Sequence, residues 1–369
     1  MTRSFSRASA ALAATFALVL AACSQGGAST GAASGAQSGP QSAASQSGES
    51  QSANASASGD SAASGDSAAS AAAAEPVPAE VTIEDNRGSQ TIPTKPKSVV
   101  VTDNRLFETL EAWDVKVAAA PKPILPATSK FKTDESVVDL GSHREPKLDA
   151  LVPLNPQVVL NGQRFTQHYD TIKALVPEAK IVDLDVRDDQ PLDAELRRQT
   201  TALGDIFGRK AEAKKLISDF DASIARVKAA YKPEQKVMTL IVSGGEINYA
   251  APKTGRTLGP VYDVLGLQPS LAQDGSTDHQ GDEISVEAIA ATNPEWILVM
   301  DRDAAVKPED GQAVTPALDV LKNSAPLANV PAVKKGQIVV MPADTYTNES
   351  IQTYTEYFNS VADAMEKAK

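Results

Sequence analysis

Cysteine and histidine are scarce, with one cysteine and three histidines in 369 residues. A lone cysteine excludes an intramolecular disulfide framework, and zinc or manganese receptors need several histidines and carboxylates that converge. The sequence also lacks the Gly-rich lysine loop of nucleotide-binding proteins, the Gly-x-Ser-x-Gly elbow of hydrolases and the His-Glu-x-x-His helix of metalloproteases. These absences argue against an enzyme and against an intrinsic cofactor, and they leave a bare-metal receptor as a weak alternative.

Basic residues are in deficit, because 35 lysines and arginines face 47 aspartates and glutamates, a net charge of −12. An acidic chain is a poor partner for nucleic acid and for an anionic membrane surface. The sequence also lacks an apolar run of the roughly 20 residues that a membrane-spanning helix needs. Neither nucleic-acid binding nor a spanning segment is therefore expected.

The N-terminus carries a short basic segment and then a small, apolar run from Ala8 to Ala22, a pattern typical of a secretory signal. The run ends Leu20-Ala-Ala-Cys23, which resembles the lipobox of bacterial lipoproteins. The resemblance implies that residues 1–22 are removed as a signal peptide. Cys23 then becomes the lipidated first residue, held at the extracytoplasmic face of the cell membrane. An ordinary secretory signal whose cysteine happens to lie near the cut is the alternative.

Residues 23–75 are almost entirely Ser, Ala, Gly and Gln after the cysteine. A segment of this composition cannot bury a core, so we expect a disordered tether. Residues 76–369 are long enough for two lobes with separate cores. The sequence therefore predicts a folded body held away from the membrane.

Short valine-rich runs alternate with helix-compatible segments through the body, which indicates parallel α/β sheets. Val81–Ile92 is typical of a β-hairpin, and a long helix is expected over Arg209–Tyr231, where apolar residues keep to one helix face. We predict an N-terminal α/β lobe over residues 76–208, a bridging helix over 209–232 and a C-terminal α/β lobe over 233–369.

An internal repeat relates the two predicted lobes. Leu148-Asp-Ala-Leu-Val-Pro-Leu-Asn-Pro156 aligns without a gap with Val286-Glu-Ala-Ile-Ala-Ala-Thr-Asn-Pro294. The same register places Arg164 opposite Arg302, each just beyond the end of an equivalent strand. Because ligands bind at the carboxyl ends of strands in open α/β sheets, we expect both arginines to face one cleft.

The chain resembles the substrate-binding lipoproteins of bacterial ABC importers for ferric siderophores, and most of all the subgroup for catecholates of the petrobactin and enterobactin kind. The segments that carry the resemblance are Lys95–Val101, Gly255-Arg256, Gly259–Gly266, Asn293–Asp303 and Lys335–Met341. The resemblance implies two three-layer α/β lobes bridged by one long helix, the class III periplasmic-binding-protein fold. It also implies a monomer that captures a ferric siderophore and delivers it to a permease with a cytoplasmic ATPase. Haem, cobalamin, ferric citrate and hydroxamate complexes are alternative ligands for the same fold.

In this subgroup, arginines from both lobes surround the ferric catecholate, and the matching positions here are Arg164, Arg256 and Arg302. Tyr169 follows Arg164 by five residues, as in the subgroup's motif, and is included in the predicted binding site. His279 and Tyr346 fall where a histidine and a tyrosine complete the iron shell when a siderophore leaves iron sites open. The sequence departs from the subgroup around both, by one extra residue after His279 and by the loss of a glycine-rich run after Tyr346. Direct iron ligation is therefore left open.

Arginine suits the expected ligand, because a ferric tris-catecholate is an aromatic anion whose iron is already wrapped in oxygen. A guanidinium group combines a permanent charge, a planar set of donors and the ability to stack on aromatic rings. The alternatives are ordinary surface roles, such as an ion pair of Arg302 with the aspartates on either side of it or a solvated loop position for His279.

Overall fold

The computed structural model describes residues 77–306 and 313–368. The predicted signal peptide, the tether and Cys23 lie outside the described residues. No described helix is long and apolar enough to cross a membrane.

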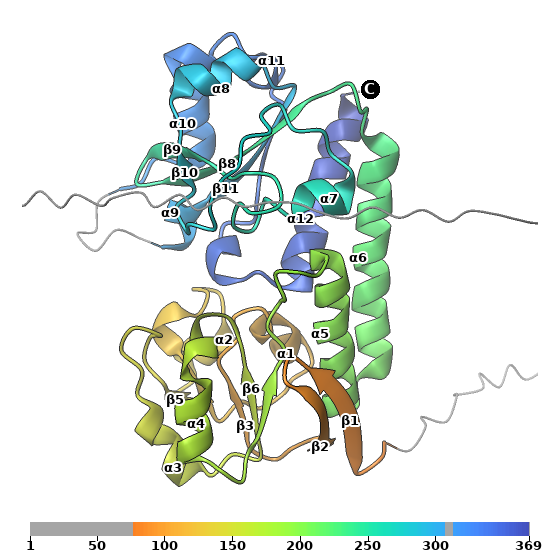
Figure 1. The fold of residues 1–369 in the computed structure, drawn as a ribbon, viewed down its shortest axis with the longest axis vertical. Coiled ribbons are helices and arrows are strands. Elements are labelled where there is room, and N and C mark those ends of the chain that lie inside the picture. The colour runs from red at the N-terminus through yellow and green to blue at the C-terminus, as the bar shows by residue number, and fades with distance from the viewer. Residues whose placement is uncertain (1–76, 307–312, 369) are drawn as a thin grey trace, which may run out of the picture. The chain divides into compact units, whose positions relative to one another are not determined.

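The N-terminal lobe is built on a five-stranded parallel sheet with the strand order β5-β4-β3-β6-β7 (Figure 1). Its strands are β3 (Val99–Val101), β4 (Ala119–Ala120), β5 (Val138–Asp139), β6 (Val158–Asn161) and β7 (Lys180–Asp183). The central strands β3 and β6 are buried and apolar except for Asn161, as expected for a parallel sheet covered on both faces.

Both faces of this sheet carry a core, because successive residues of a strand point to opposite sides. Val99 and Val101 pack in one core, whereas Val100 packs in the other. Helices α1 (Phe107–Ala112), α2 (Lys130–Thr133) and α5 (Leu192–Phe207) contribute to the first core, and α3 (Leu151–Leu154) and α4 (Tyr169–Leu175) to the second. The lobe therefore has the three layers that the resemblance implied.

The C-terminal lobe has a five-stranded sheet with the order β10-β9-β8-β11-β12. Its strands are β8 (Val237–Ser243), β9 (Glu246–Tyr249), β10 (Asp282–Glu283), β11 (Trp296–Asp301) and β12 (Ile338–Val340). Helices α7 (Val261–Leu265) and α12 (Ile351–Lys367) pack on one face of the sheet, and α8 (Val286–Thr292), α10 (Ala317–Asn323) and α11 (Pro331–Lys334) pack on the other.

This second sheet is mixed, because an antiparallel strand joins its parallel ones. Strands β8, β11 and β12 are parallel, but β9 pairs antiparallel with both β8 and β10. The cause is local, because Gly244 and Gly245 both have positive φ and close a two-residue hairpin turn between β8 and β9. A Gly-Gly pair is a strong hairpin signal, since each residue of such a turn needs a positive φ.

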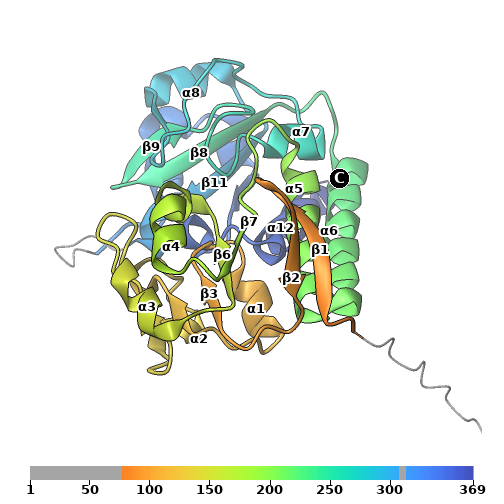
Figure 2. The same ribbon diagram turned by 60° about the horizontal axis from the view of Figure 1, so that its bottom comes forward.

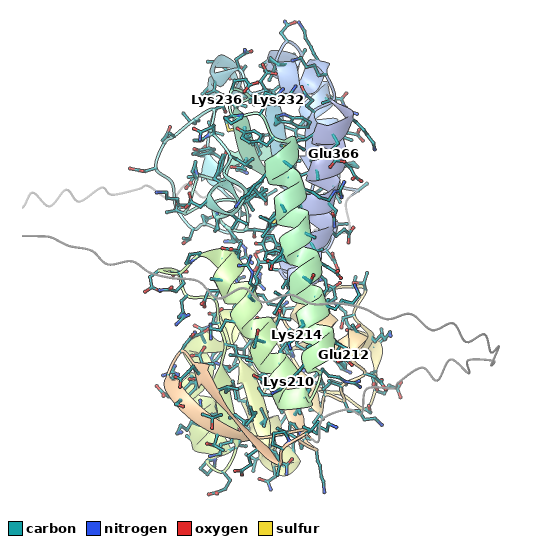
Figure 3. The ribbon with its side chains drawn as sticks, turned by 90° about the vertical axis from the view of Figure 1, so that its right-hand side faces the viewer. Lys210, Glu212, Lys214, Lys232, Lys236 and Glu366 are labelled. Carbon is teal, nitrogen blue, oxygen red and sulfur yellow. The ribbon has the colours of Figure 1, made fainter. Side chains whose placement is uncertain are left out.

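Helix α6 (Lys210–Ala230) joins the lobes and lies within the predicted bridging segment. Ala213 belongs to a core of the N-terminal lobe, whereas Phe220, Ile224 and Val227 belong to a core of the C-terminal lobe. Figure 1 shows α6 running along both lobes, and Figure 3 shows its charged outer face, with Lys210, Glu212 and Lys214 near its beginning.

Helix α5 also connects the two cores, which the sequence analysis did not anticipate. Leu192 and Leu196 near its beginning pack in the core of the C-terminal lobe, and Leu203 and Ile206 near its end pack in the N-terminal lobe. The predicted hairpin is present as β1 (Glu80–Asp85) and β2 (Gly88–Pro93), and it lies beside α5 (Figures 1 and 2). Helix α5 therefore packs in both lobes beside the long bridging helix α6.

The internal repeat has a shared backbone feature. Asn155 ends α3 with φ 39° and ψ 62°, and Asn293 ends α8 with φ 51° and ψ 52°. Both asparagines are left-handed C-caps, which lets the chain reverse into β6 and β11. The two copies of the repeat thus deliver equivalent strands to the two sheets.

We expect Asn155→Ala and Asn293→Ala each to lower the free energy of unfolding by about 1 kcal/mol, because alanine pays a steric cost in the left-handed region. Asn155→Gly and Asn293→Gly are the matched controls and should leave it within a few tenths of a kcal/mol of the parent. Urea unfolding of the four variants measures the difference. Alanine variants with the parental midpoint would show that the left-handed caps contribute nothing.

Candidate ligand-binding site

The three predicted arginines converge on one aromatic ring. The guanidinium carbons of Arg164, Arg256 and Arg302 lie 5.4, 4.7 and 4.8 Å from the centre of the Tyr346 ring. These distances are within the range of cation–π interactions, which extends to about 6 Å. Arg164 comes from the N-terminal lobe, and Arg256, Arg302 and Tyr346 come from the C-terminal lobe. We call these four residues the arginine group, and it lies where the lobes meet.

Each arginine is positioned by the end of a strand or by a tight loop. Arg164 follows β6 in a short 3-10 helix, and Arg302 begins α9 (Arg302–Ala305) directly after β11. Arg256 lies in a compact loop after β9 in which Gly255 and Gly259 pack backbone against backbone. A Cβ on Gly255 would lie 2.4 Å from the amide nitrogen of Ala251, so only glycine fits there. The predicted positions of Arg164 and Arg302 beyond equivalent strands are confirmed.

Tyr346 is held in place by the charges around it. Its side chain is buried, with 8% of the residue exposed, in a 3-10 turn over Thr345–Thr347. Burial alone would raise the pKa of the phenol. The nearby guanidinium of Arg302, together with the positive charges of Arg256 and Arg164, instead lowers that pKa below its ordinary value. The site therefore favours a negative charge on an aromatic oxygen.

Glu349 is the counter-ion of this group and contacts both lobes. One carboxylate oxygen lies 3.4 Å from Arg256 and accepts a hydrogen bond from Thr257, both in the C-terminal lobe. The other lies 3.5 Å from Arg105 and 2.6 Å from the side-chain amide of Gln163, both in the N-terminal lobe. Burial disfavours the charged form of Glu349. The nearby charges of Arg256 and Arg105, aided by the hydrogen bond from Thr257, outweigh that penalty and lower its pKa to about 2.

Positive charge exceeds negative charge in the assembled group. Arg105 also pairs with Asp185 at 2.9 Å, so Glu349 and Asp185 are the carboxylates in direct contact with the four arginines. Asp103 lies next to them, and burial raises its pKa to about 7 although Arg105 opposes the shift. A site of this composition can accept a multiply charged anion.

A second set of contacts fixes the segment that carries Tyr346 and Glu349. Glu108 of α1 accepts hydrogen bonds from Asn348 and from the hydroxyl of Ser350, at the beginning of α12. The amide group of Asn104 donates to the carbonyl of Thr347 at 2.9 Å. The turn that presents Tyr346 is therefore held by the N-terminal lobe, although it belongs to the C-terminal lobe.

The structure does not bring Tyr169 to this group. Tyr169 begins α4 and packs in a core of the N-terminal lobe, with the guanidinium of Arg87 lying 3.5 Å from its ring centre. The side chain of Tyr169 points into the lobe because the chain turns from a 3-10 helix into α4 between Arg164 and Tyr169. Tyr169 is therefore better described as a core residue.

The histidines lie at the margin of the site. His279 is partly exposed in a loop, and its Nδ1 lies 3.7 Å from Asp278. Burial lowers the pKa of His279, Asp278 opposes this, and Arg302 and Arg256 lower it further, so the ring is within electrostatic reach of the arginine group. His143 accepts a hydrogen bond at its carbonyl from His168, which ties two loops of the N-terminal lobe together. Among the described residues, no group of three or more His, Cys, Asp or Glu side chains is arranged to hold a metal ion.

Arg105 and Glu349 were missed by the sequence analysis, although a signal was present. Arg105 follows β3 by four residues, and Glu349 lies on the segment after β12. Both therefore come from the carboxyl ends of strands, as Arg164 and Arg302 do. The rule that ligands bind at the carboxyl ends of strands selected Arg164 and Arg302, and it applies equally to every parallel strand of the two sheets.

Two three-layer α/β lobes, joined by a long helix and with charged side chains gathered where the lobes meet, define the class III periplasmic-binding-protein fold. The model of the family described as periplasmic binding protein matches residues 99–345, and the chain belongs to this family. It is a binding protein and not an enzyme.

Several relatives are similar over most of the chain. The petrobactin-binding protein YclQ of Bacillus subtilis is 29% identical over 289 residues, which cover 77% of this chain and 86% of the relative. The ferric-anguibactin-binding protein FatB of Vibrio anguillarum is 26% identical over 275 residues, or 74% of this chain and 83% of the relative. The crystal structure of YclQ superposes with a TM-score of 0.65 at 26% identity and covers 78% of this chain and 99% of that one.

We expect Glu349→Gln to lower the free energy of unfolding by a few kcal/mol at pH 7, because it leaves Arg256 without a counter-charge and Arg105 with Asp185 alone. The folded-state pKa of Glu349 lies below its ordinary value, so this contribution is complete above about pH 4.5 and is lost as the pH falls through about 2. The difference between parent and variant should therefore shrink between pH 5 and pH 2 in urea unfolding.

Glu356→Gln is the control, because Glu356 lies exposed on α12 and should change stability by less than about 0.5 kcal/mol. A Glu349→Gln variant that is as stable as the parent at pH 7 would contradict the role of Glu349 as the shared counter-ion.

Proposed function

We propose that the chain captures a ferric siderophore of the catecholate type outside the cytoplasm and delivers it to an ABC permease for iron uptake. The observation that carries this proposal is the convergence of Arg164, Arg256 and Arg302 from both lobes on a single aromatic ring. The names of the relatives YclQ and FatB point to the same class of ligand.

The chemistry of the group matches an anionic aromatic ligand. Tyr346 already presents to the arginines what a catecholate would present, an aromatic face and an oxygen whose negative charge is favoured. The Nε atoms of Arg256 and Arg302 are buried without a hydrogen-bond partner among the described residues, so the site would gain from ligand oxygens brought within their reach. A ligand that supplies these oxygens relieves the cost of burying unsatisfied donors.

The charge interaction favours the binding of an anion. A unit charge pair at about 4 Å is worth roughly 4 kcal/mol at an effective dielectric of 20, before desolvation is subtracted. Three arginines therefore oppose part of the loss of hydration of a bound anion. An acidic chain with this positive group also concentrates an anionic ligand at one place.

Tyr346 and His279 differ in how they relate to a bound iron. Tyr346 lies within the arginine group, whereas His279 lies at its margin beside Asp278. A hexadentate siderophore needs neither residue as an iron ligand. With a tetradentate siderophore, Tyr346 is the better placed of the two to complete the iron shell.

Ferric citrate, ferric hydroxamates, haem and cobalamin are the competing ligands. Ferric citrate and the hydroxamates lack the catechol ring, so they lose the cation–π contribution, which is roughly 0.5–2 kcal/mol per contact. Competition between a ferric catecholate and each alternative for the purified chain ranks them directly.

We expect Arg164→Ala, Arg256→Ala and Arg302→Ala each to weaken the binding of a ferric catecholate at least tenfold, because each removes a charge from the site. Quenching of intrinsic fluorescence during titration gives the affinity. Arg226→Ala is the matched control and should bind like the parent, because Arg226 pairs with Asp363 and Glu366 far from Tyr346. Parental affinity in all three site variants would show that the ligand binds elsewhere.

We further propose that a lipid on Cys23 holds the chain at the extracytoplasmic face of the membrane, and that the chain acts as a monomer. Tethering raises the local concentration of the loaded receptor near its permease without any new contact. The support is the signal-like segment and the Leu20-Ala-Ala-Cys23 motif.

Cys23→Ala should release the chain from the membrane fraction while leaving its affinity for the ferric siderophore unchanged, because the cysteine lies far along the chain from the arginine group. Cell fractionation followed by ligand titration of the released chain measures both. Membrane retention of the Cys23→Ala chain would contradict the anchor.

A further inference from the structure

A hollow of about 540 Å³ lies on the N-terminal lobe, away from the arginine group. Four basic side chains line it: Lys95, Lys97, Lys116 and Arg209. They come from three separate stretches of the chain, the loop before β3, the loop after α1 and the beginning of α6. The apolar side chains of Trp113 and Phe207, each 6% exposed, also line it. We call this feature the basic hollow.

The charge of the basic hollow contrasts with that of the chain. Its four exposed cations face one acidic lining residue, Asp114, in a sequence with a net charge of −12. No described residue forms an ion pair with Lys95, Lys97 or Lys116, whereas Arg209 pairs with Glu212 at 3.0 Å. Three of the four positive charges therefore remain available to an external anion.

The described chain begins beside this hollow. A Cβ added to Gly208 would lie 3.1 Å from a side-chain carbon of Val77 and 2.8 Å from the side chain of Lys95. Val77 is the first described residue, so residues 24–76 lead from this place back to Cys23. The positive charge thus gathers where the chain leaves the folded body toward its proposed lipid anchor.

We propose that the basic hollow binds the anionic phospholipid headgroups of the membrane on which the chain is anchored. This inference rests on the proposed lipid anchor. Exposed lysines from two segments, with Arg209 from a third, suit an extended charged surface better than a single enclosed ion. Each lysine near an anionic membrane contributes about a fivefold gain in partitioning.

The acidic remainder of the chain does not prevent this contact. Charges farther than about 8–10 Å from the surface are screened at physiological ionic strength, so the local charge of the contacting face decides the interaction. The contact also sets an orientation. With the basic hollow on the membrane, the beginning of α6 faces the lipid.

The test uses residues 23–369 with Cys23→Ser, so that binding does not depend on acylation. The protein is sedimented with vesicles of phosphatidylglycerol and phosphatidylcholine in equal parts, and with vesicles of phosphatidylcholine alone. We expect binding to the first vesicles only, and its loss at 0.5 M NaCl. Lys95→Glu/Lys97→Glu/Lys116→Glu should lower the partition coefficient at least tenfold.

The matched control is Lys228→Glu/Lys232→Glu/Lys236→Glu, which makes the same change in net charge. These exposed lysines lie at and beyond the other end of α6, where Figure 3 shows Lys232 and Lys236. The control should retain parental partitioning. Both triple variants should keep the parental far-ultraviolet spectrum and parental affinity for the ferric siderophore, which separates this test from that of the proposed function.

Three results would overturn the proposal. The first is equal partitioning to both kinds of vesicle, and the second is an equal loss in the two triple variants. The third is displacement from anionic vesicles by millimolar inorganic phosphate at constant ionic strength, which would assign the hollow to a small soluble anion instead.

Discussion

The carboxylate of Glu349, buried where the two lobes meet, is the interaction on which the arginine group depends. A carboxylate removed from water costs several kcal/mol unless it is fully paired, so its position is set by its partners. Those partners are divided between Arg105 and Gln163 on one lobe and Arg256 and Thr257 on the other. Movement of one lobe away from the other would leave the carboxylate or its arginines unpaired. The structure therefore favours small adjustments between the lobes over wide opening.

The same interaction fixes the ring at the centre of the group. Tyr346 lies three residues before Glu349, and the segment between them is also held by Asn104 and Glu108 of the opposite lobe. Glu349 neutralises part of the surrounding positive charge, which stabilises the arginine group without a ligand. The positive charge that remains still attracts an anion. A bound anion would then contribute to the stability of the folded chain through mass action.

Much of the fold could be predicted because its signals are local. The valine-rich runs gave the principal strands of both sheets, and the periodicity of Phe220, Ile224 and Val227 gave the bridging helix. Strand β9 was missed because the Gly244-Gly245 turn was not weighed as a hairpin. The packing of α5 in both lobes was missed because only the tertiary structure decides that Leu192 is buried in one lobe and Leu203 in the other.

Within the candidate site, Arg164 and Arg302 were predictable because the internal repeat gives them equivalent positions in the two lobes. Arg164 and Arg302 share a register, so one rule found both. Arg105 and Glu349 follow strands but lie outside the repeat, and their pairing joins residues 244 positions apart, from different lobes, which no local pattern reveals. Tyr169 was misplaced because the spacing from Arg164 does not reveal that the side chain turns into the core.

The lobes differ in how they supply their second arginine. In the N-terminal lobe, the chain leaves β3 through Arg105 and continues into α1. In the C-terminal lobe, the Gly244-Gly245 turn takes that place, and the arginine comes instead from the loop after β9, as Arg256. Glu349 pairs with these two non-equivalent arginines, whereas the equivalent pair, Arg164 and Arg302, makes no ion pair with a described carboxylate within 4 Å. The duplicated positions therefore retain their charge for a ligand, and the positions where the lobes diverge hold the lobes together.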